Sequence, residues 1–89
     1  MKSFQMIKVQ AITAKWCKKC VQAKLKLADY DIEWLDMDED YEAGIIIRFF
    51  NIIHLPSFIL HYNAGTSVTT SVLEVKKKFE EIQGQENTT

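Results

Sequence analysis

Bulky and polar side chains recur with two different periods along the chain, and the period distinguishes strands from helices. They alternate at every second residue over Met6–Ile12, which predicts a strand. Short apolar stretches bounded by turn residues predict a second strand over Ile32–Met37 and a third over Ser57–Tyr62. The tight turn Asn63–Gly65 and a fourth strand over Thr66–Thr70 complete an antiparallel hairpin.

A first amphipathic helix is predicted between Cys17 and Ala28, where apolar residues recur at helical spacing. Its expected buried face consists of Cys17, Val21, Leu25 and Ala28. Its expected solvent face consists of Lys18, Lys19, Gln22 and Lys26. The cysteine at position 17 therefore stands where this helix begins, shortly after the first strand.

Two further helices follow from the same spacing. The apolar set of the second helix is Ala43, Ile46, Ile47 and Phe50. This helix should end near Asn51, and Asp38 or Asp40 is placed to cap its first turn. The third helix follows a capping-box pattern over Ser71–Glu74, and Gly84 suits its end. Its expected buried stripe is Val72, Val75, Phe79 and Ile82.

The predicted order of elements is β-α-β-α-β-β-α, which places the chain in the α/β class. Strands joined through a helix run parallel, whereas the hairpin adds an antiparallel edge, so we expect a four-stranded mixed sheet with helices on both faces. With 89 residues the chain has material for one core only. We expect one domain over residues 1–84 and a disordered polar tail over residues 85–89.

Composition excludes several classes of function. The net charge of −1 gives no basic footprint for nucleic acid, so we expect no nucleic-acid partner. No apolar run approaches the roughly 20 residues that cross a bilayer, and the N-terminus lacks the apolar region of a signal peptide. No long apolar seam indicates an obligate dimer. We therefore expect a cytoplasmic monomer without a membrane partner.

The two cysteines, Cys17 and Cys20, lie three residues apart, which points to chemistry rather than to a structural staple. Unpaired N–H groups and the macrodipole at a helix N-terminus favour a thiolate, so Cys17 is the predicted nucleophile. Cys20 lies one turn further along and deeper, where it can attack a mixed disulfide formed at Cys17. Lys15, Lys18 and Lys19 add positive charge, and we expect them to stabilise the thiolate form of Cys17.

A zinc site is the main alternative for the cysteine pair. Cys-x-x-Cys spacing suits tetrahedral thiolate ligation, and His54 and His61 are available to complete four ligands. The two histidines lie seven residues apart across a strand, so they should face opposite sides of it. We therefore expect no bound metal.

Four motifs together resemble the thioredoxin family between Met6 and Ile82. They are Trp16-Cys17-x-x-Cys20, Asp36-Met37-Asp38-Glu39, Phe50-Asn51-Ile52-x-x-Leu55-Pro56-Ser57-Phe58-Ile59-Leu60 and Asn63-Ala64-Gly65. The resemblance implies a cis Leu55–Pro56 bond packed against both cysteines, with the backbone of Leu55 pairing with an extended substrate. It also implies that Trp16 shields the thiols and lines the docking surface. His54 then lies beside Cys17, where it either tunes the thiolate and touches substrate or is an ordinary loop histidine.

The chain also departs from the family pattern. It lacks the extra N-terminal strand and helix, and the shorter topology is also typical of glutaredoxins. Ala11 stands where thioredoxins usually carry a buried Asp, and Lys18-Lys19 replaces Gly-Pro. His54-Leu55 stands where glutaredoxins have Thr-Val, and Thr70–Leu73 replaces their glutathione-binding turn.

The predicted function is thiol–disulfide oxidoreduction in cell redox homeostasis. Reduced Cys17 attacks the disulfide of a protein substrate, and Cys20 resolves the intermediate, with no cofactor beyond the Cys17–Cys20 disulfide. The expected electron donor is a thioredoxin reductase-type protein or glutathione. A glutathione-linked glutaredoxin is one alternative, and a redox-silent or zinc-binding interaction module is the other.

Overall fold

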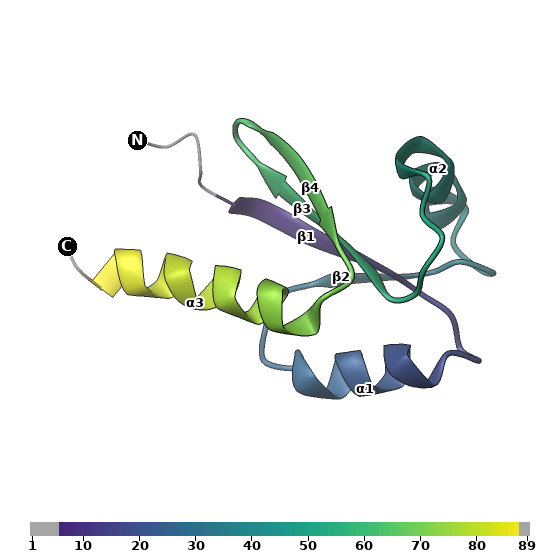
Figure 1. Cartoon of the computed structure of the whole chain (residues 1–89), viewed down its shortest axis with the longest axis horizontal. Helices are drawn as coiled ribbons and strands as arrows, with labels where there is room; N and C mark the ends of the chain where they lie inside the picture. Colours follow the sequence, from purple (N-terminus) through teal and green to yellow (C-terminus); the bar gives the residue numbers. More distant parts are fainter. Residues whose placement is uncertain (1–5, 88–89) are drawn as a thin grey trace.

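The computed structural model describes residues 6–87, and the side chains up to residue 81 (Figure 1). Its elements are β1 (Met6–Thr13), α1 (Lys18–Lys26), β2 (Glu33–Asp36), α2 (Tyr41–Phe50), β3 (Ser57–Tyr62), β4 (Gly65–Thr69) and α3 (Val72–Asn87). Their order is β-α-β-α-β-β-α, which confirms the predicted α/β class. No helix within this part of the chain is long and apolar enough to span a membrane.

The four strands form one mixed sheet in the order β2-β1-β3-β4. β1 runs parallel to β2, with Ala11 beside Trp34, because α1 carries the chain back across the sheet between them. β1 and β3 are antiparallel, with Ala11 also beside Phe58. β3 and β4 form the expected hairpin. β1 and β3 are therefore the central strands.

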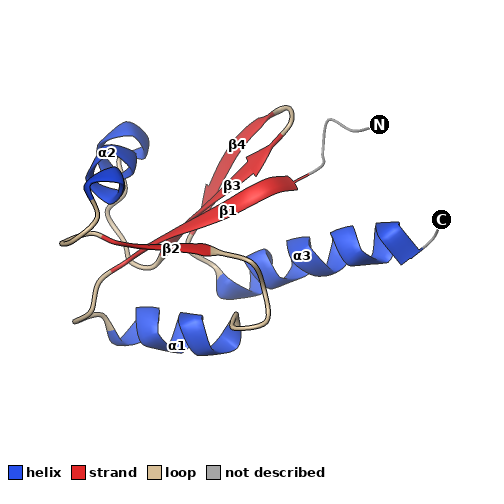
Figure 2. Cartoon of the chain, turned by 180° about the vertical axis from the view of Figure 1, so that it is seen from behind, coloured by secondary structure: helices blue, strands red, loops and turns tan. Residues whose placement is uncertain are grey.

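Helices cover both faces of this sheet: α1 and α3 lie on one face and α2 lies on the other (Figure 2). Alternate side chains of β1 serve the two layers, since Ala11 packs in the core under α1 and α3, whereas Ile12 packs under α2. The first core cluster contains Val9, Ala11, Ala23, Leu27, Ile32, Phe58, Leu60 and Val75. The second contains Ile12, Leu35, Ala43, Ile46 and Ile59.

The predicted buried face of α1 is wrong. Val21 and Leu25 are 51% and 74% exposed, and the buried residues of the helix are Cys20 and Ala23, followed by Leu27 just after its end. Both sets have helical spacing, but they lie on different sides of the helix, and only one side meets the sheet. On this inward side, Ala23 and Leu27 pack with Val9 and Ala11 of β1 in the first core cluster.

A polar residue flanks α2 at each end. Asp40 occupies the N-cap position, but its carboxylate makes no cap hydrogen bond and instead accepts from the backbone N–H of Asp36 at 2.7 Å. The expected side-chain cap is therefore absent. Asn51 ends the helix as predicted, in the left-handed conformation (φ 54°, ψ 49°) that asparagine tolerates better than most residues.

Half of the predicted capping box forms at α3. The hydroxyl of Ser71 accepts from the N–H of Glu74 at 3.1 Å, but the Glu74 carboxylate accepts from the hydroxyl of Thr69. Val75 is buried as expected, and the side chain of Ile82 lies outside the described residues.

The helix α3 continues past Gly84 to Asn87, so Gly84 does not end it. Residues 85–87 of the expected tail thus belong to the helix. Residues 88 and 89 lie outside the described part of the chain. The domain boundary at Gly84 stays a prediction.

Candidate active site

Cys17 stands at the N-cap of α1, directly after the loop that leaves β1. Its backbone is extended (φ −92°, ψ 109°), and its N–H donates to the carbonyl of Ala14 at 3.1 Å. Its Sγ accepts a hydrogen bond from the N–H of Cys20 at 3.2 Å. The sulfur therefore takes the role of an N-cap acceptor and lies where the positive end of the helix dipole favours negative charge.

Cys20 lies behind Cys17, one turn further into the molecule. Only 1% of its surface is exposed, against 8% for Cys17, and it packs with Ala14 and Leu55. Both cysteines are free thiols. Burial, reinforced by the hydrogen bond with Cys17, raises the pKa of Cys20 to about 11. The pair thus has an outer thiol within reach of a groove and an inner thiol that stays protonated at neutral pH.

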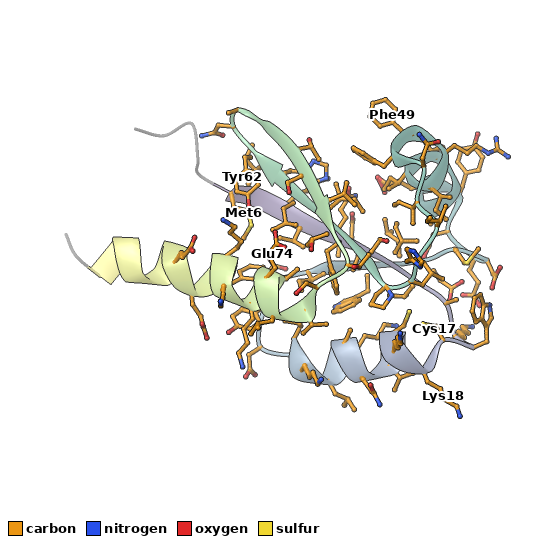
Figure 3. All side chains as sticks on the ribbon, in the orientation of Figure 1. Met6, Cys17, Lys18, Phe49, Tyr62 and Glu74 are labelled. Atoms are coloured by element: carbon orange, nitrogen blue, oxygen red, sulfur yellow. The ribbon has the colours of Figure 1, made fainter. Side chains whose placement is uncertain are left out.

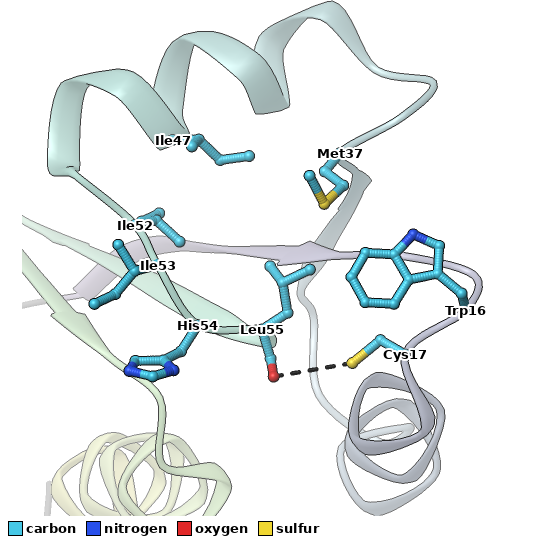
Figure 4. Close-up of a pocket in the computed structure, with 8 residues that line it drawn as sticks. All are labelled: Trp16, Cys17, Met37, Ile47, Ile52, Ile53, His54 and Leu55. Atoms are coloured by element: carbon cyan, nitrogen blue, oxygen red, sulfur yellow. Dashed lines mark hydrogen bonds between the residues drawn. The ribbon is translucent and has the colours of Figure 1, made fainter.

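The loop before β3 forms the wall opposite Cys17. The Leu55–Pro56 peptide bond is cis, as the resemblance implied, and Pro56 is buried. The thiol of Cys17 donates a weak hydrogen bond to the carbonyl of Leu55 over 3.9 Å (Figure 4). The hydroxyl of Ser57 donates to the carbonyl of His54 at 2.6 Å, which fastens the loop to the start of β3.

A groove of about 360 Å³ opens beside Cys17. Its lining residues are Trp16, Cys17, Met37, Ile47, Ile52, Ile53, His54 and Leu55 (Figure 4). The lining combines four predicted site residues with four that the sequence analysis did not single out. Ile52 is part of the motif that leads to Pro56, so the motif contained a signal for it, whereas Ile53 occupies one of the unspecified positions of that motif. Met37 also stands in a quoted motif, Asp36-Met37-Asp38-Glu39, whereas Ile47 was predicted only as a buried residue of α2.

Trp16 is 68% exposed, yet its orientation is fixed. The indole Nε1–H donates to Oδ2 of Asp38 at 3.1 Å. Asp38 belongs to a turn in which a carboxylate oxygen of Asp36 accepts from the N–H groups of Asp38 and Glu39, at 2.8 and 3.1 Å. The acidic stretch is thus a solvated turn, and it holds the tryptophan at the rim of the groove.

The three predicted charge-tuning lysines differ in their surroundings. The ammonium of Lys15 pairs with the carboxylate of Glu39, which raises the pKa of Lys15. The negative charge of Glu39 therefore compensates part of the positive charge of Lys15. Lys18 and Lys19 are exposed in the first turn of α1, and Lys18 points away from the sheet (Figure 3). The influence of these lysines on Cys17 stays a prediction.

The two histidines lie in different surroundings. His54 is exposed and lines the groove beside Cys17. His61 lies on β3, where its Nε2 makes a 2.8 Å hydrogen bond with the side-chain oxygen of Gln10. Burial and the nearby Lys8 lower the pKa of His61. Within residues 6–81, no group of three or more His, Cys, Asp or Glu side chains is arranged to hold a metal ion.

No protein-family model matches the sequence, and no curated protein matches it. Solved structures do match the fold. A thioredoxin from Trypanosoma brucei brucei superposes with a TM-score of 0.64 at 18% identity, over 93% of this chain and 80% of that one. Thioredoxin O2 from Arabidopsis thaliana, in its oxidized state, gives 0.56 at 19% identity, over 83% and 72% of the two chains.

A reduced thioredoxin preprotein from Schistosoma mansoni gives a TM-score of 0.59 at 25% identity, over 89% of this chain and 80% of that one. The chain has a thioredoxin-like fold. The thioredoxin-like resemblance of the sequence is thereby confirmed for the architecture, including the four-stranded mixed sheet with helices on both faces.

Proposed function

We propose that this thioredoxin-like protein is a thiol–disulfide oxidoreductase that reduces disulfides in protein substrates. One arrangement carries the proposal. The Sγ of Cys17 is a helix N-cap acceptor beside an apolar groove, and the second thiol, Cys20, lies one turn behind it. This arrangement supplies an outer nucleophile, a binding surface beside it and a resolving group behind it.

The first step is attack by the Cys17 thiolate on one sulfur of the substrate disulfide. A bond forms between that sulfur and Sγ of Cys17, and the substrate S–S bond breaks to release the other sulfur as a thiolate. The carbonyl of Leu55 faces Sγ of Cys17, where the backbone of an extended substrate can pair with this loop. Trp16, His54 and Pro56 complete the proposed binding surface.

The second step transfers the linkage to Cys20. Its sulfur attacks Sγ of Cys17, the S–S bond of the mixed disulfide breaks, and the remaining substrate sulfur leaves as a thiolate. Because the pKa of Cys20 is raised to about 11, its proton has to leave as the attack proceeds. Ala11 offers no carboxylate to take it, so the proton passes to water or to the thiolate released in the first step. Two electrons have then moved from the dithiol to the substrate, and a Cys17–Cys20 disulfide remains.

A protein reductase is the proposed electron donor, with glutathione as the alternative. None of the eight side chains that line the groove is a lysine or an arginine. Glutathione carries two carboxylates, and the groove offers them no permanent positive partner. This lining supports a protein disulfide as the ligand of the groove.

The test is the reduction of insulin, first with dithiothreitol and then with either thioredoxin reductase and NADPH or glutathione and its reductase. We expect turnover by the wild type, greater with thioredoxin reductase than with glutathione. Cys17→Ser should fall to the uncatalysed rate. Cys20→Ser should accumulate a mixed disulfide with insulin, visible as added mass that a reductant removes.

The redox-silent alternative is tested by counting thiols before and after a mild oxidant. A dithiol enzyme should lose both titratable thiols together, and metal analysis should find no stoichiometric zinc. A wild-type protein that keeps both thiols, or that reduces insulin no faster than Cys17→Ser does, would contradict the proposed function.

A further inference from the structure

The outer face of α1 combines a dense positive charge with exposed apolar side chains. Its nine residues, KKCVQAKLK, include four lysines and no acidic residue. Its lysines, Lys18, Lys19, Lys24 and Lys26, are all exposed. Val21 and Leu25 are exposed among them, by 51% and 74%. The helix thus presents a basic surface with an apolar centre, which we call the α1 surface.

This charge is not neutralised within the described part of the chain. None of the four lysines forms an ion pair with another described residue. Only Lys24 has an aromatic partner, with its ammonium 5.9 Å from the centre of the Trp34 ring. The whole chain carries a net charge of −1, so the charge of the α1 surface is a local feature set against an acidic remainder.

The opposite rim of the site is acidic. The turn Asp36–Asp40 lies beyond Trp16, and Met37 of this turn and the start of α1 lie on opposite sides of Cys17 in Figure 4. Of these carboxylates, only that of Glu39 pairs with a lysine. A partner that extends beyond the groove therefore meets positive charge on one side and negative charge on the other.

We propose that the α1 surface docks an acidic segment of a protein partner whose disulfide reacts at Cys17. This inference rests on the proposed function. A uniformly anionic polymer or a lipid surface would meet the acidic turn as well as the lysines, whereas one polypeptide can place an acidic segment on the α1 surface alone. Leu25 and Val21 give such a segment an apolar anchor beside its charges.

The dimensions of α1 fix where the acidic residues lie in the partner. Nine helical residues span about 13 Å, and extended chain covers about 3.3 Å per residue. A segment that runs from Cys17 along α1 therefore reaches Lys24 and Lys26 roughly three to four residues from its reactive cysteine. Acidic residues at that separation, next to a large apolar one, define the partner class.

The test uses two synthetic peptides, each with one cysteine held as a pyridyl mixed disulfide. They are identical except that one has glutamates and the other lysines about three to four residues from the cysteine, beside a leucine. The reduced protein converts each into free peptide thiol and thiopyridone, while its own dithiol becomes a disulfide. Thiopyridone absorbance gives the second-order rate constant, and uncharged dipyridyl disulfide reports the intrinsic reactivity of the thiols.

At low ionic strength we expect the acidic peptide to react about tenfold faster than the basic one, and about 1 M salt should remove most of the difference. The variant Lys24→Gln/Leu25→Ser/Lys26→Gln should slow the acidic peptide about fivefold and leave dipyridyl disulfide unchanged. The matched control is Lys76→Gln/Lys77→Gln/Leu73→Ser, which removes the same exposed groups from α3 and should leave both reactions unchanged.

Equal rates for the two peptides, with dipyridyl disulfide still reduced, would overturn the docking surface and leave the proposed function standing. Failure to reduce dipyridyl disulfide would instead contradict the function itself. Binding to phosphatidylglycerol vesicles or duplex DNA that the α1 triple variant abolishes would also overturn the assignment to a protein partner. The salt dependence of the wild type tests the proposal even where the triple variant fails to fold.

Discussion

The backbone N–H of Cys20 donates a hydrogen bond to Sγ of Cys17 over 3.2 Å, so the second cysteine supports the first one before any reaction begins. The donor lies in the first turn of α1, and the same N–H also donates to the backbone carbonyl of Cys17 at 3.2 Å, so the two acceptors share it. A side-chain oxygen usually accepts it, and here a sulfur takes that place. The spacing of the two cysteines therefore sets both the stabilisation of the outer sulfur and the position of the inner one.

Iodoacetamide should distinguish the two thiols by rate. At neutral pH we expect Cys17 to react about tenfold faster than a simple peptide thiol, because the helix N-terminus favours its thiolate. Cys20 should remain unlabelled, since it is buried and its pKa is raised to about 11. Mass spectrometry of the labelled protein, over a range of pH, measures both rates. The variant Cys20→Ala gives the rate of Cys17 alone, and a rate no higher than that of the peptide thiol would remove the basis of the mechanism.

The raised pKa of Cys20 also predicts a pH dependence of stability. The folded state holds the proton on Cys20 up to about pH 11, whereas the unfolded chain releases it near 9.0. Above that lower value the unfolded state binds fewer protons, so the stability contributed by the neutral thiol is lost as pH rises from about 9 to 11. Chemical denaturation of the reduced protein should show wild type losing stability faster over this window than Cys20→Ala. Parallel pH profiles for the two proteins would contradict the prediction.

Asp38 should act on the reaction by holding Trp16. The variant Asp38→Ala removes the acceptor of the indole N–H, so the ring loses its fixed orientation at the rim of the groove. We expect kcat/KM for insulin reduction to fall about threefold to tenfold, with the free energy of unfolding changed by less than about 1 kcal/mol because the contact is exposed. Asp38→Asn keeps an acceptor and should recover most of the activity. Time-resolved anisotropy of Trp16 in a Trp34→Phe background reports the freed ring directly.

His61 should make the protein less stable as pH falls below neutrality. Its pKa is lowered by burial and by Lys8, against the opposing effects of Glu33 and Glu42. The unfolded chain therefore takes up the proton first, and stability is lost as pH falls below the ordinary histidine value near 6.5. His61→Gln keeps a polar partner for Gln10 but does not titrate, so its stability should change less between pH 7 and pH 5. The exposed His54→Gln should retain the full wild-type loss, and the reverse order of the two variants would refute this assignment.

Much of the architecture could be predicted from the sequence because the local signals agree with one another. The period-two pattern over Met6–Ile12, the hairpin turn at Asn63–Gly65 and the stop at Asn51 each specify their element without help from distant residues. The nucleophile and its resolving partner follow from the spacing of Cys17 and Cys20. Met37 stood in a motif and Ile47 in a predicted helix, but their meeting in one groove could not be predicted, because only tertiary packing brings the turn after β2 and the helix α2 to the same place.

The orientation of α1 could not be predicted for a related reason. Its sequence contains two apolar sets at helical spacing, and hydrophobicity alone favours the one with Val21 and Leu25. The sheet instead receives the smaller side chains of Cys20 and Ala23, with Leu27 after the last turn. The inward side is therefore the one that packs Ala23 and Leu27 into the cluster with β1 and buries the inner thiol.

Two leucines at the end of this helix test that orientation. Leu27 is fully buried in the cluster under α1, whereas Leu25 is 74% exposed only two positions earlier. Leu27→Ala should cost about 2–5 kcal/mol, since it removes buried methyl groups and leaves a cavity. Leu25→Ala should change the free energy of unfolding by less than about 0.5 kcal/mol, because alanine keeps the helix and removes only exposed surface. Urea denaturation measures the free energy of unfolding of the two variants. A larger loss of stability for Leu25→Ala than for Leu27→Ala would contradict the orientation seen in the structure and favour the one that the apolar pattern predicts.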